Sequence, residues 1–238
     1  MWGIVPAAGS GSRIQPLAFS KELLPVGGGD RPRAVSEYLL ERMVIAGADK
    51  ICVVSSPWKS DIPRYYGGNY GRANLAYAIQ SEPLGLCDAI FRALPFIGPE
   101  EQAVVGLPDT VWFPDHAMCA LPDGELSFLL FPVDHPEFFD TVLTDHDRVR
   151  EIQVKSATPA GNWIWGAFKL PGRILAELHD LWRARDRADQ YIGTLVNAWL
   201  EAGGRAMGVP AGKSYVDVGT LHGYREAMRL LETRETAA

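Results

Sequence analysis

Short apolar runs alternate with segments of helical spacing along the first half of the chain. The runs at residues 1–6, 50–55 and 102–107 are continuous, which is typical of strands buried on both faces. Between them, residues 32–47 and 85–96 place apolar side chains three or four positions apart, which predicts helices. Strand–helix–strand units of this kind favour a parallel sheet covered by helices.

The second half of the chain is richer in strand patterns. The remaining predicted elements are helices at 61–66, 172–183, 191–202 and 221–232, and strands at 75–80, 126–132, 141–144, 149–155, 162–168, 205–209 and 214–216. Together the patterns predict an α/β fold with a mostly parallel sheet flanked by helices and an inserted mixed β region. No segment has the composition of a linker, so we expect a single domain over residues 1–238.

Charge and cysteine content narrow the range of partners. The 23 basic and 29 acidic residues give a net charge of −6, which argues against general nucleic-acid binding. The three cysteines are widely spaced and contain no Cys-x-x-Cys pair, which favours reduced thiols over disulfides or a zinc site. No apolar stretch approaches the length of a membrane span. We therefore expect a cytoplasmic protein without a membrane partner.

The segment 6–26 carries the strongest chemical signal. It follows the first predicted strand and supplies two cations, Arg13 and Lys21, after a loop of small residues that includes Ala7, Ala8, Gly9 and Gly11. Small residues let backbone N–H groups approach an anion closely, and Arg and Lys add positive charge, as the triphosphate of a nucleotide requires. The spacing fits neither a Walker A motif nor a dinucleotide fingerprint.

The whole segment resembles the signature of the sugar-1-phosphate nucleotidylyltransferases, in particular the glucose-1-phosphate thymidylyltransferases and uridylyltransferases. Their pattern is Ala-Ala-Gly-x-Gly-(Thr/Ser)-Arg, an apolar residue, x-Pro, and then a Lys ahead of Leu-Leu-Pro, and every position is filled here. The resemblance implies a Rossmann-like nucleotide half, Mg²⁺ as the cofactor, and catalytic roles for Arg13, Lys21 and a later lysine, Lys155. A homo-oligomer is compatible with it, because relatives are often oligomeric.

Gln80 and Gly85 match the family residues that contact the base. The five-residue spacing ahead of a predicted helix is the same as in the thymidylyl and uridylyl enzymes. A glutamine amide offers one donor group and one acceptor, which match the O4 and N3–H of uracil or thymine. A flipped amide would serve cytosine equally well, so the sequence leaves the base open.

Two aspartates match the metal-binding positions of the family. Asp109 follows the strand at 102–107 and also counts among the nucleotide-binding residues, although Pro108 stands where relatives have Gly. Asp217 lies in Tyr-Val-Asp-Val-Gly-Thr, which is similar to the family's Trp-x-Asp-x-Gly-Thr. Two carboxylates suit a hard cation such as Mg²⁺ that also takes phosphate oxygens and waters. The alternative for each aspartate is a helix cap.

The acceptor half matches the family less well. Lys155 corresponds to a lysine that holds the sugar phosphate, but Val154 precedes it where relatives carry a Glu. Asp140 stands near a family Gly of the sugar site, and Gly166 matches a Gly that flanks the same pocket. Asp140, Lys155 and Gly166 are thus the candidate acceptor-binding residues, and glucose 1-phosphate is one candidate acceptor among several phosphates.

The implied reaction joins a nucleoside triphosphate, preferably UTP or dTTP, to a sugar 1-phosphate and releases pyrophosphate. Two alternatives stay open at this point. One is a cytidylyltransferase that acts on a non-sugar phosphate. The other is a nucleotide-binding regulatory protein without turnover, for which the altered acceptor half is the argument.

Overall fold

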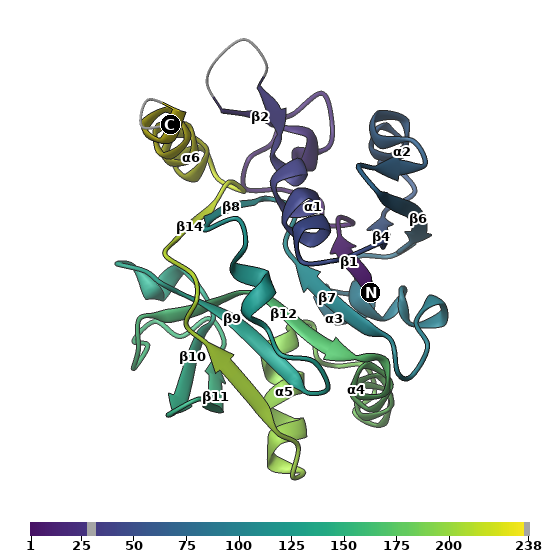
Figure 1. The fold of residues 1–238 in the computed structure, drawn as a ribbon, viewed down its shortest axis with the longest axis vertical. Helices are drawn as coiled ribbons and strands as arrows, with labels where there is room; N and C mark the ends of the chain where they lie inside the picture. The colour runs from purple at the N-terminus through teal and green to yellow at the C-terminus, as the bar shows by residue number, and fades with distance from the viewer. Residues whose placement is uncertain (28–31, 236–238) are drawn as a thin grey trace.

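A ten-stranded sheet forms the centre of the molecule in the computed structural model, which describes residues 1–27 and 32–235 (Figure 1). The strand order is β10-β11-β13-β9-β12-β7-β1-β4-β6-β5. The strands are β1 (Trp2–Pro6), β4 (Lys50–Ser55), β5 (Asn69–Tyr70), β6 (Ala73–Ile79), β7 (Gln102–Gly106), β9 (Leu126–Pro132), β10 (Thr141–Asp145), β11 (Arg148–Gln153), β12 (Trp163–Pro171) and β13 (Ala206–Val209).

Parallel pairing is concentrated in the half of the sheet built from the first part of the chain. There β7, β1, β4 and β6 lie side by side in one direction. Beyond β7 the sheet continues through β12, which is antiparallel to both β7 and β9, and β9 pairs with β13 in parallel. The expected α/β fold is confirmed, and the mixed region continues the same sheet.

Helices cover both faces of the sheet. On one face α1 (Val35–Ile45) and α2 (Asp61–Tyr66) pack through Leu39, Met43 and Ile62. The opposite face carries α3 (Leu86–Phe91), α4 (Gly172–Ala184) and α5 (Ile192–Glu201). Strand β1 alternates between the two cores: Ile4 packs with α3 and α4, while Val5 packs with α1. This explains why its sequence is apolar at consecutive positions.

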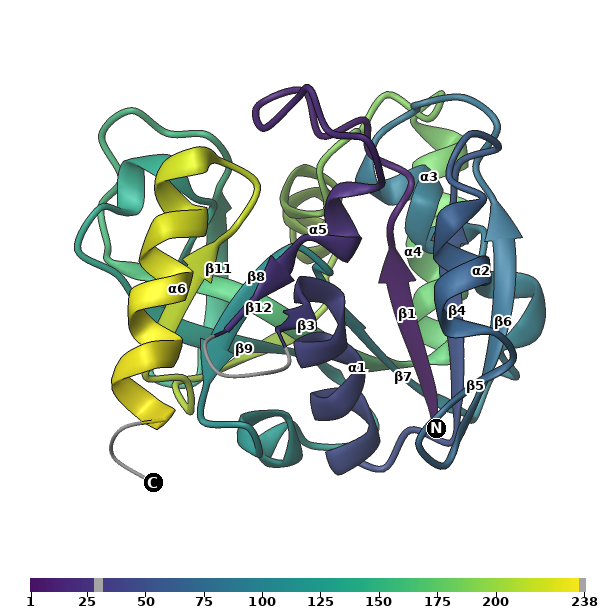
Figure 2. The same ribbon diagram turned by 90° about the horizontal axis from the view of Figure 1, so that it is seen from above.

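A third apolar cluster lies beside the main sheet. The helix α6 (Leu221–Glu235) packs there against two short ladders, which Figure 2 shows from above. One ladder pairs β2 (Pro25–Val26) with β3 (Arg33–Ala34), and the other pairs β8 (Thr110–Phe113) with β14 (Ser214–Asp217). Residues from the two ends of the chain therefore share one core.

Most predicted elements are confirmed within one to three residues, but the short strands β2, β3, β5 and β8 were not predicted, and one helix is shorter than expected. Residues 33–34 form strand β3, so the first helix begins at Val35. The helix expected over 85–96 ends at Phe91, because Pro95 has no N–H to continue the helical hydrogen bonds, and a 3₁₀ turn follows at Leu94–Phe96. Strand β8 was not predicted, because only four residues separate Asp109 from Pro114.

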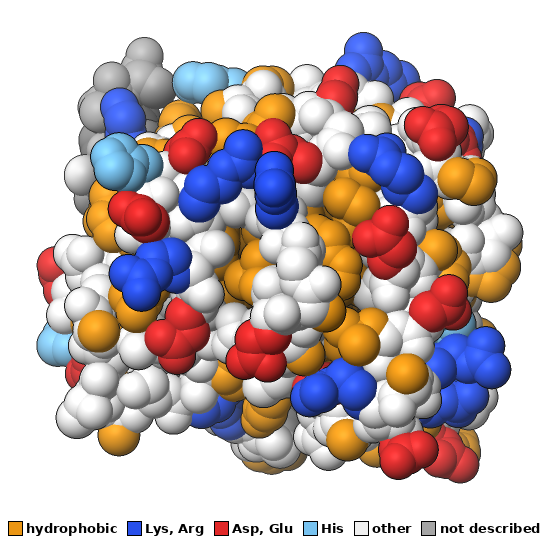
Figure 3. Space-filling view, turned by 90° about the horizontal axis from the view of Figure 1, so that it is seen from below, with side chains coloured by type: hydrophobic (Ala, Val, Ile, Leu, Met, Phe, Trp, Pro, Cys, Tyr) orange, Lys and Arg blue, Asp and Glu red, His pale blue; other side chains and the backbone are white. Residues whose placement is uncertain are grey.

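The surface and the thiols add little chemistry of their own. On the face opposite to that of Figure 2, acidic and basic side chains are interspersed (Figure 3). Cys52 and Cys87 are buried, and burial raises the pKa of each thiol to about 12, whereas Cys119 is exposed. Among the residues described, no helix combines the length and the apolar character needed to cross a membrane.

A buried arginine joins α1 to the ladder that carries β8. Arg42 is 1% exposed and donates hydrogen bonds to the carbonyl of Tyr38 at 2.7 Å and to the carbonyl of Trp112 at 2.5 Å. It also forms an ion pair with Asp115 at 2.8 Å. Burial lowers the pKa of Arg42 to about 10, since the charged form loses water. The position of β8 relative to α1 thus depends on one guanidinium.

We expect Arg42→Met to lower the free energy of unfolding by about 1–3 kcal/mol, because it leaves the Trp112 carbonyl without its donor. Urea denaturation followed by tryptophan fluorescence measures the change. Arg72→Met is the matched control, since Arg72 donates to the Val44 carbonyl from an exposed position. Equal losses in the two variants would show that Arg42 does not anchor β8.

Candidate functional site

The predicted nucleotide-binding segments meet at one edge of the sheet. The parallel strands β1, β4, β6 and β7 end there, and ligands of doubly wound sheets bind beyond the carboxyl ends of such strands. The segment after β1 holds the signature loop, Gln80 follows β6, and Asp109 follows β7. Figure 2 shows β1 pointing toward the loop that follows it.

The two signature cations pair with the two predicted metal-binding aspartates. Lys21 forms an ion pair with Asp109, and Arg13 lies 3.2 Å from Asp217. Burial opposes the charged form of Lys21, but the carboxylate of Asp109 outweighs it and the pKa of Lys21 is raised. Lys21 is therefore a fixed cation, while the side chain of Arg13 stays 62% exposed and free to meet a ligand.

The ladder of β8 and β14 brings the two aspartates together. Asp217 is paired with Thr110, the residue after Asp109, and the Val218 N–H donates to the Asp109 carbonyl at 2.8 Å. Asp217 also accepts the N–H of Gly219 at 2.7 Å, whereas Thr220 caps the start of α6 by accepting the N–H of Gly223. The helix-cap alternative for Asp217 is thus not needed.

The space beside Gly219 tests whether these residues suit a cation. A Cβ placed on Gly219 would lie 2.8 Å from Asp217 Oδ1 and 3.1 Å from Asp109 Oδ2. Two carboxylate oxygens therefore come close to one point, as the ligands of a hard divalent cation do, but Arg13 Nη2 lies 3.0 Å from the same point and would have to move for such an ion to bind. No group of three or more metal-ligating side chains occurs among the described residues, so the remaining ligands of such an ion would be phosphate oxygens and water.

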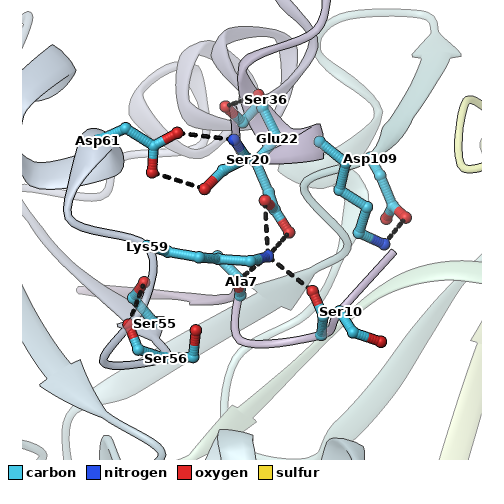
Figure 4. A network of polar contacts seen from close by, with 12 residues as sticks. Ala7, Ser10, Ser20, Glu22, Ser36, Ser55, Ser56, Lys59, Asp61 and Asp109 are labelled. Atoms are coloured by element: carbon cyan, nitrogen blue, oxygen red, sulfur yellow. Dashed lines mark hydrogen bonds and ion pairs between the residues drawn. The ribbon is translucent and has the colours of Figure 1, made fainter. Parts of the chain in front are cut away.

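Sequence reasoning missed Lys59, which lies under the signature loop. Its ammonium donates to the carbonyls of Ala7 at 2.7 Å and Gly9 at 2.6 Å and to both oxygens of Glu22 at 2.8 Å (Figure 4). Glu22 is 1% exposed, and burial raises its pKa although Lys59 opposes the shift. The sequence shows only that Lys59 follows the end of a buried strand, because its contacts with the loop and with Glu22 arise from the fold.

Further contacts fix the part of the signature segment around Lys21. The N–H and hydroxyl of Ser20 donate to the two carboxylate oxygens of Asp61 at 2.6 Å each, as Figure 4 shows. The Ser36 hydroxyl donates to the Glu22 carbonyl at 2.6 Å. Gly11 has a φ of 65°, and a Cβ there would lie 2.8 Å from Cδ of Lys21. Glycine at this position therefore lets the Lys21 side chain pass across the loop.

Gln80 and Gly85 lie together but apart from the cations. The Gln80 backbone N–H donates to the Ser55 carbonyl at 2.8 Å, and its side chain is 4% exposed. Gly85 has a φ of 95°, and a Cβ there would lie 2.8 Å from backbone atoms of Gln190. Gly85 is thus required both by its backbone conformation and by the close approach of the segment before α5.

The acceptor candidates Asp140 and Lys155 contact each other. The backbone N–H of Lys155 donates to Asp140 Oδ1 at 3.1 Å, and the Lys155 ammonium lies 3.9 Å from the same atom. Lys155 has a φ of 50°, which is uncommon for a residue with a side chain. Burial raises the pKa of Asp140, although Lys155 opposes the shift. The pair places the ammonium of Lys155, whose side chain is 56% exposed, beside the Asp140 carboxylate, whose side chain is only 10% exposed.

Tyr215, which the sequence analysis did not single out, connects the acceptor candidates to the metal candidates. Burial raises the pKa of its phenol strongly, and the charges of Asp217, Asp109 and Asp140 raise it further. A Cβ on Gly166 would lie 2.7 Å from the Tyr215 ring and 2.5 Å from Phe131. Gly166 therefore makes room for Tyr215, which lies between the two halves of the site.

Comparison with known proteins identifies the class of this site. A family model described as nucleotidyl transferase matches residues 2–234, and the chain belongs to this family. Its members that resemble the chain are sugar-phosphate nucleotidyltransferases, so the chain is a nucleotidyltransferase enzyme by family.

Named relatives and solved structures agree with this placement. The glucose-1-phosphate thymidylyltransferase of Xanthomonas campestris pv. campestris is 28% identical over 97% of this chain and 80% of its own length. That of Neisseria meningitidis is 27% identical over 98% and 83%. The UTP-bound UGPase from Acinetobacter baumannii has a TM-score of 0.78 at 20% identity, covering 96% of this chain and 92% of that one, which supports the fold.

We expect Lys59→Met to lower the free energy of unfolding at pH 7.5 by about 3 kcal/mol, because it leaves the Glu22 carboxylate buried without its partner. The loss should shrink as the pH falls. A raised folded-state pKa means that the folded protein binds the proton first, so acidification toward the ordinary value of 4.5 favours the folded state. Removing Lys59, which lowers this pKa, strengthens that dependence.

Urea denaturation between pH 7.5 and 5.5 measures this effect. The double variant Lys59→Met/Glu22→Gln is the control, and its free energy of unfolding should depend less on pH than that of Lys59→Met, since no carboxylate is left at position 22. A deficit of Lys59→Met that is constant over the same range would contradict the buried ion pair.

Proposed function

We propose that this enzyme transfers a nucleotidyl group from UTP or dTTP to a sugar 1-phosphate, with release of pyrophosphate. The observation that carries the proposal is the pairing of Lys21 with Asp109 and of Arg13 with Asp217 at the carboxyl edge of the parallel strands. A phosphate-binding loop, two cations and two converging carboxylates are the parts that phosphoryl-group chemistry needs.

The bond changes balance without a catalytic base. An oxygen of the acceptor phosphate, which is already anionic, attacks the α-phosphorus in line. The bond from that phosphorus to the bridging oxygen breaks, and pyrophosphate leaves with the electron pair. Lys21 and Arg13 neutralise the charge that shifts onto the phosphate oxygens, and the loop N–H groups hold the triphosphate in register.

Asp109 and Asp217 would hold Mg²⁺ in this reaction, since their oxygens come close to one point beside Gly219. When bound, the ion would supply further neutralisation of the phosphates. Both carboxylates now pair with the signature cations, so a second role follows for these residues: they keep Lys21 and Arg13 positioned before the nucleotide arrives.

Lys155 is proposed to bind the acceptor phosphate. Its ammonium is exposed beside Asp140, and the charges of Asp140 and of both metal candidates raise the pKa of Tyr215, which supports one common site. The relatives' names specify glucose 1-phosphate as an acceptor, which makes this compound the first to test. We further propose that the enzyme works in the cytoplasm as a single domain, where nucleoside triphosphates are available.

We expect Asp109→Asn and Lys21→Ala each to reduce pyrophosphate release by about 10²-fold or more, because each removes charge stabilisation at the reacting phosphates. The assay uses purified protein, Mg²⁺, UTP or dTTP, and glucose 1-phosphate or other sugar 1-phosphates.

Asp49→Asn is the control for loss of one carboxylate. Asp49 pairs with the N-terminal amine at 2.8 Å, ahead of β4 and so at the opposite edge of the sheet. We expect this variant to keep the wild-type rate. If the wild-type protein released no pyrophosphate with any pair of nucleotide and sugar 1-phosphate, the proposed function would be refuted. If Asp109→Asn worked at the wild-type rate, the role of Asp109 would be refuted.

A further inference from the structure

Both hydrogens of the Gln80 amide are used within the protein. Gln80 Nε2 donates to the Gly85 carbonyl at 3.0 Å and to Asp88 Oδ2 at 2.8 Å. A carbonyl and a carboxylate can only accept, so the amide nitrogen must face them. Turning the amide over would place its oxygen against two acceptors and remove one donor from each of them. Its orientation is therefore fixed by its partners.

Asp88 is itself held in place. It lies in the first turn of α3 and is 3% exposed. Arg92, one turn later, donates to Asp88 Oδ2 at 3.2 Å and to Oδ1 at 2.9 Å. A guanidinium has donors only, so both oxygens of Asp88 act as acceptors toward it. Asp88 can therefore act on Gln80 only as an acceptor.

The backbone around Gln80 is equally constrained. Its N–H is bonded to Ser55 at the end of β4, and its carbonyl partner Gly85 is fixed against Gln190. The amide oxygen Oε1 is the one polar side-chain atom of Gln80 to which no described residue donates. Toward a ligand, Gln80 can thus present an acceptor and no donor.

Nucleobases differ in what they place opposite such an acceptor. Opposite ring position 3, uracil and thymine place an N–H donor, whereas cytosine places a lone pair there and carries its own donor, an amino group, at position 4. An acceptor therefore favours uracil or thymine when it lies opposite position 3. We propose that Asp88 is a positioning residue that locks Gln80 as an acceptor and thereby selects uracil or thymine nucleotides over cytosine nucleotides. The inference rests on the proposed function and on the family match of Gln80 to a base-contacting residue, and it includes that Oε1 lies opposite ring position 3.

The test is nucleotide binding by calorimetry with Mg²⁺ and no acceptor. The wild-type protein should bind UTP and dTTP at least about tenfold more tightly than CTP, because CTP leaves Oε1 facing a lone pair. In Asp88→Asn the new amide can donate to Oε1, so that only the Gly85 carbonyl still opposes a turned Gln80 side chain. The ratio of the UTP and CTP dissociation constants should then fall to within about threefold or invert.

Glu101→Gln is the matched control. Glu101 also accepts from a nearby cation, Lys50, at 2.6 Å, and from Trp2 Nε1 at 3.2 Å, but it precedes β7 at the opposite edge of the sheet. This variant should keep the wild-type ratio. If Asp88 had only a structural role, Asp88→Asn would weaken the binding of all nucleotides equally and leave the ratio of the dissociation constants unchanged. That result would overturn the inference.

A second probe does not depend on the folding of a variant. UTP methylated at N3 keeps both carbonyls but has no N–H donor, and the wild-type protein should bind it at least about tenfold more weakly than UTP. Equal binding of the two, or equal binding of UTP and CTP, would overturn the inference. Pyrophosphate release tests the proposed function separately: turnover with an unchanged ratio in Asp88→Asn refutes the role of Asp88 alone.

Discussion

The ammonium of Lys59 is the contact on which the geometry of the nucleotide half depends. It donates to two loop carbonyls and to the buried carboxylate of Glu22, and so links the end of β1 to the segment that carries Lys21. Because the carbonyls of Ala7 and Gly9 accept from Lys59, this contact fixes the conformation of the loop. The charge of Lys59 is balanced by Glu22, as that of Lys21 is by Asp109 and that of Arg13 by Asp217.

The remaining site follows from a second constraint, the pairing of β8 with β14. This ladder sets Asp109 beside Asp217, and each carboxylate then orients one of the signature cations. Arg42 fixes β8 from the side of α1, and α6 covers the ladder with the third apolar cluster. Two ion pairs at the site thus rely on packing that lies outside the main sheet.

The sequence predicted the sheet and helices well because continuous apolar runs and helical spacing report burial directly. It also predicted that Arg13, Lys21, Asp109 and Asp217 belong together, and the structure places them in two ion pairs. It could not predict Lys59 or Asp88, because their roles depend on contacts with residues 37 and 8 positions away, respectively. Strand β8 was not predicted because four residues are too few to show a periodic pattern.

The ladder of β8 and β14 also sets the order in which the site can be assembled during synthesis. The signature loop and Asp109 come from the first half of the chain, but Asp217 and the strand that positions it come from near its end. A growing chain that has formed β1, β4, β6 and β7 would therefore have a phosphate-binding loop but only one of the two carboxylates. Catalytic competence would arrive late, only after the parallel part of the sheet had been made.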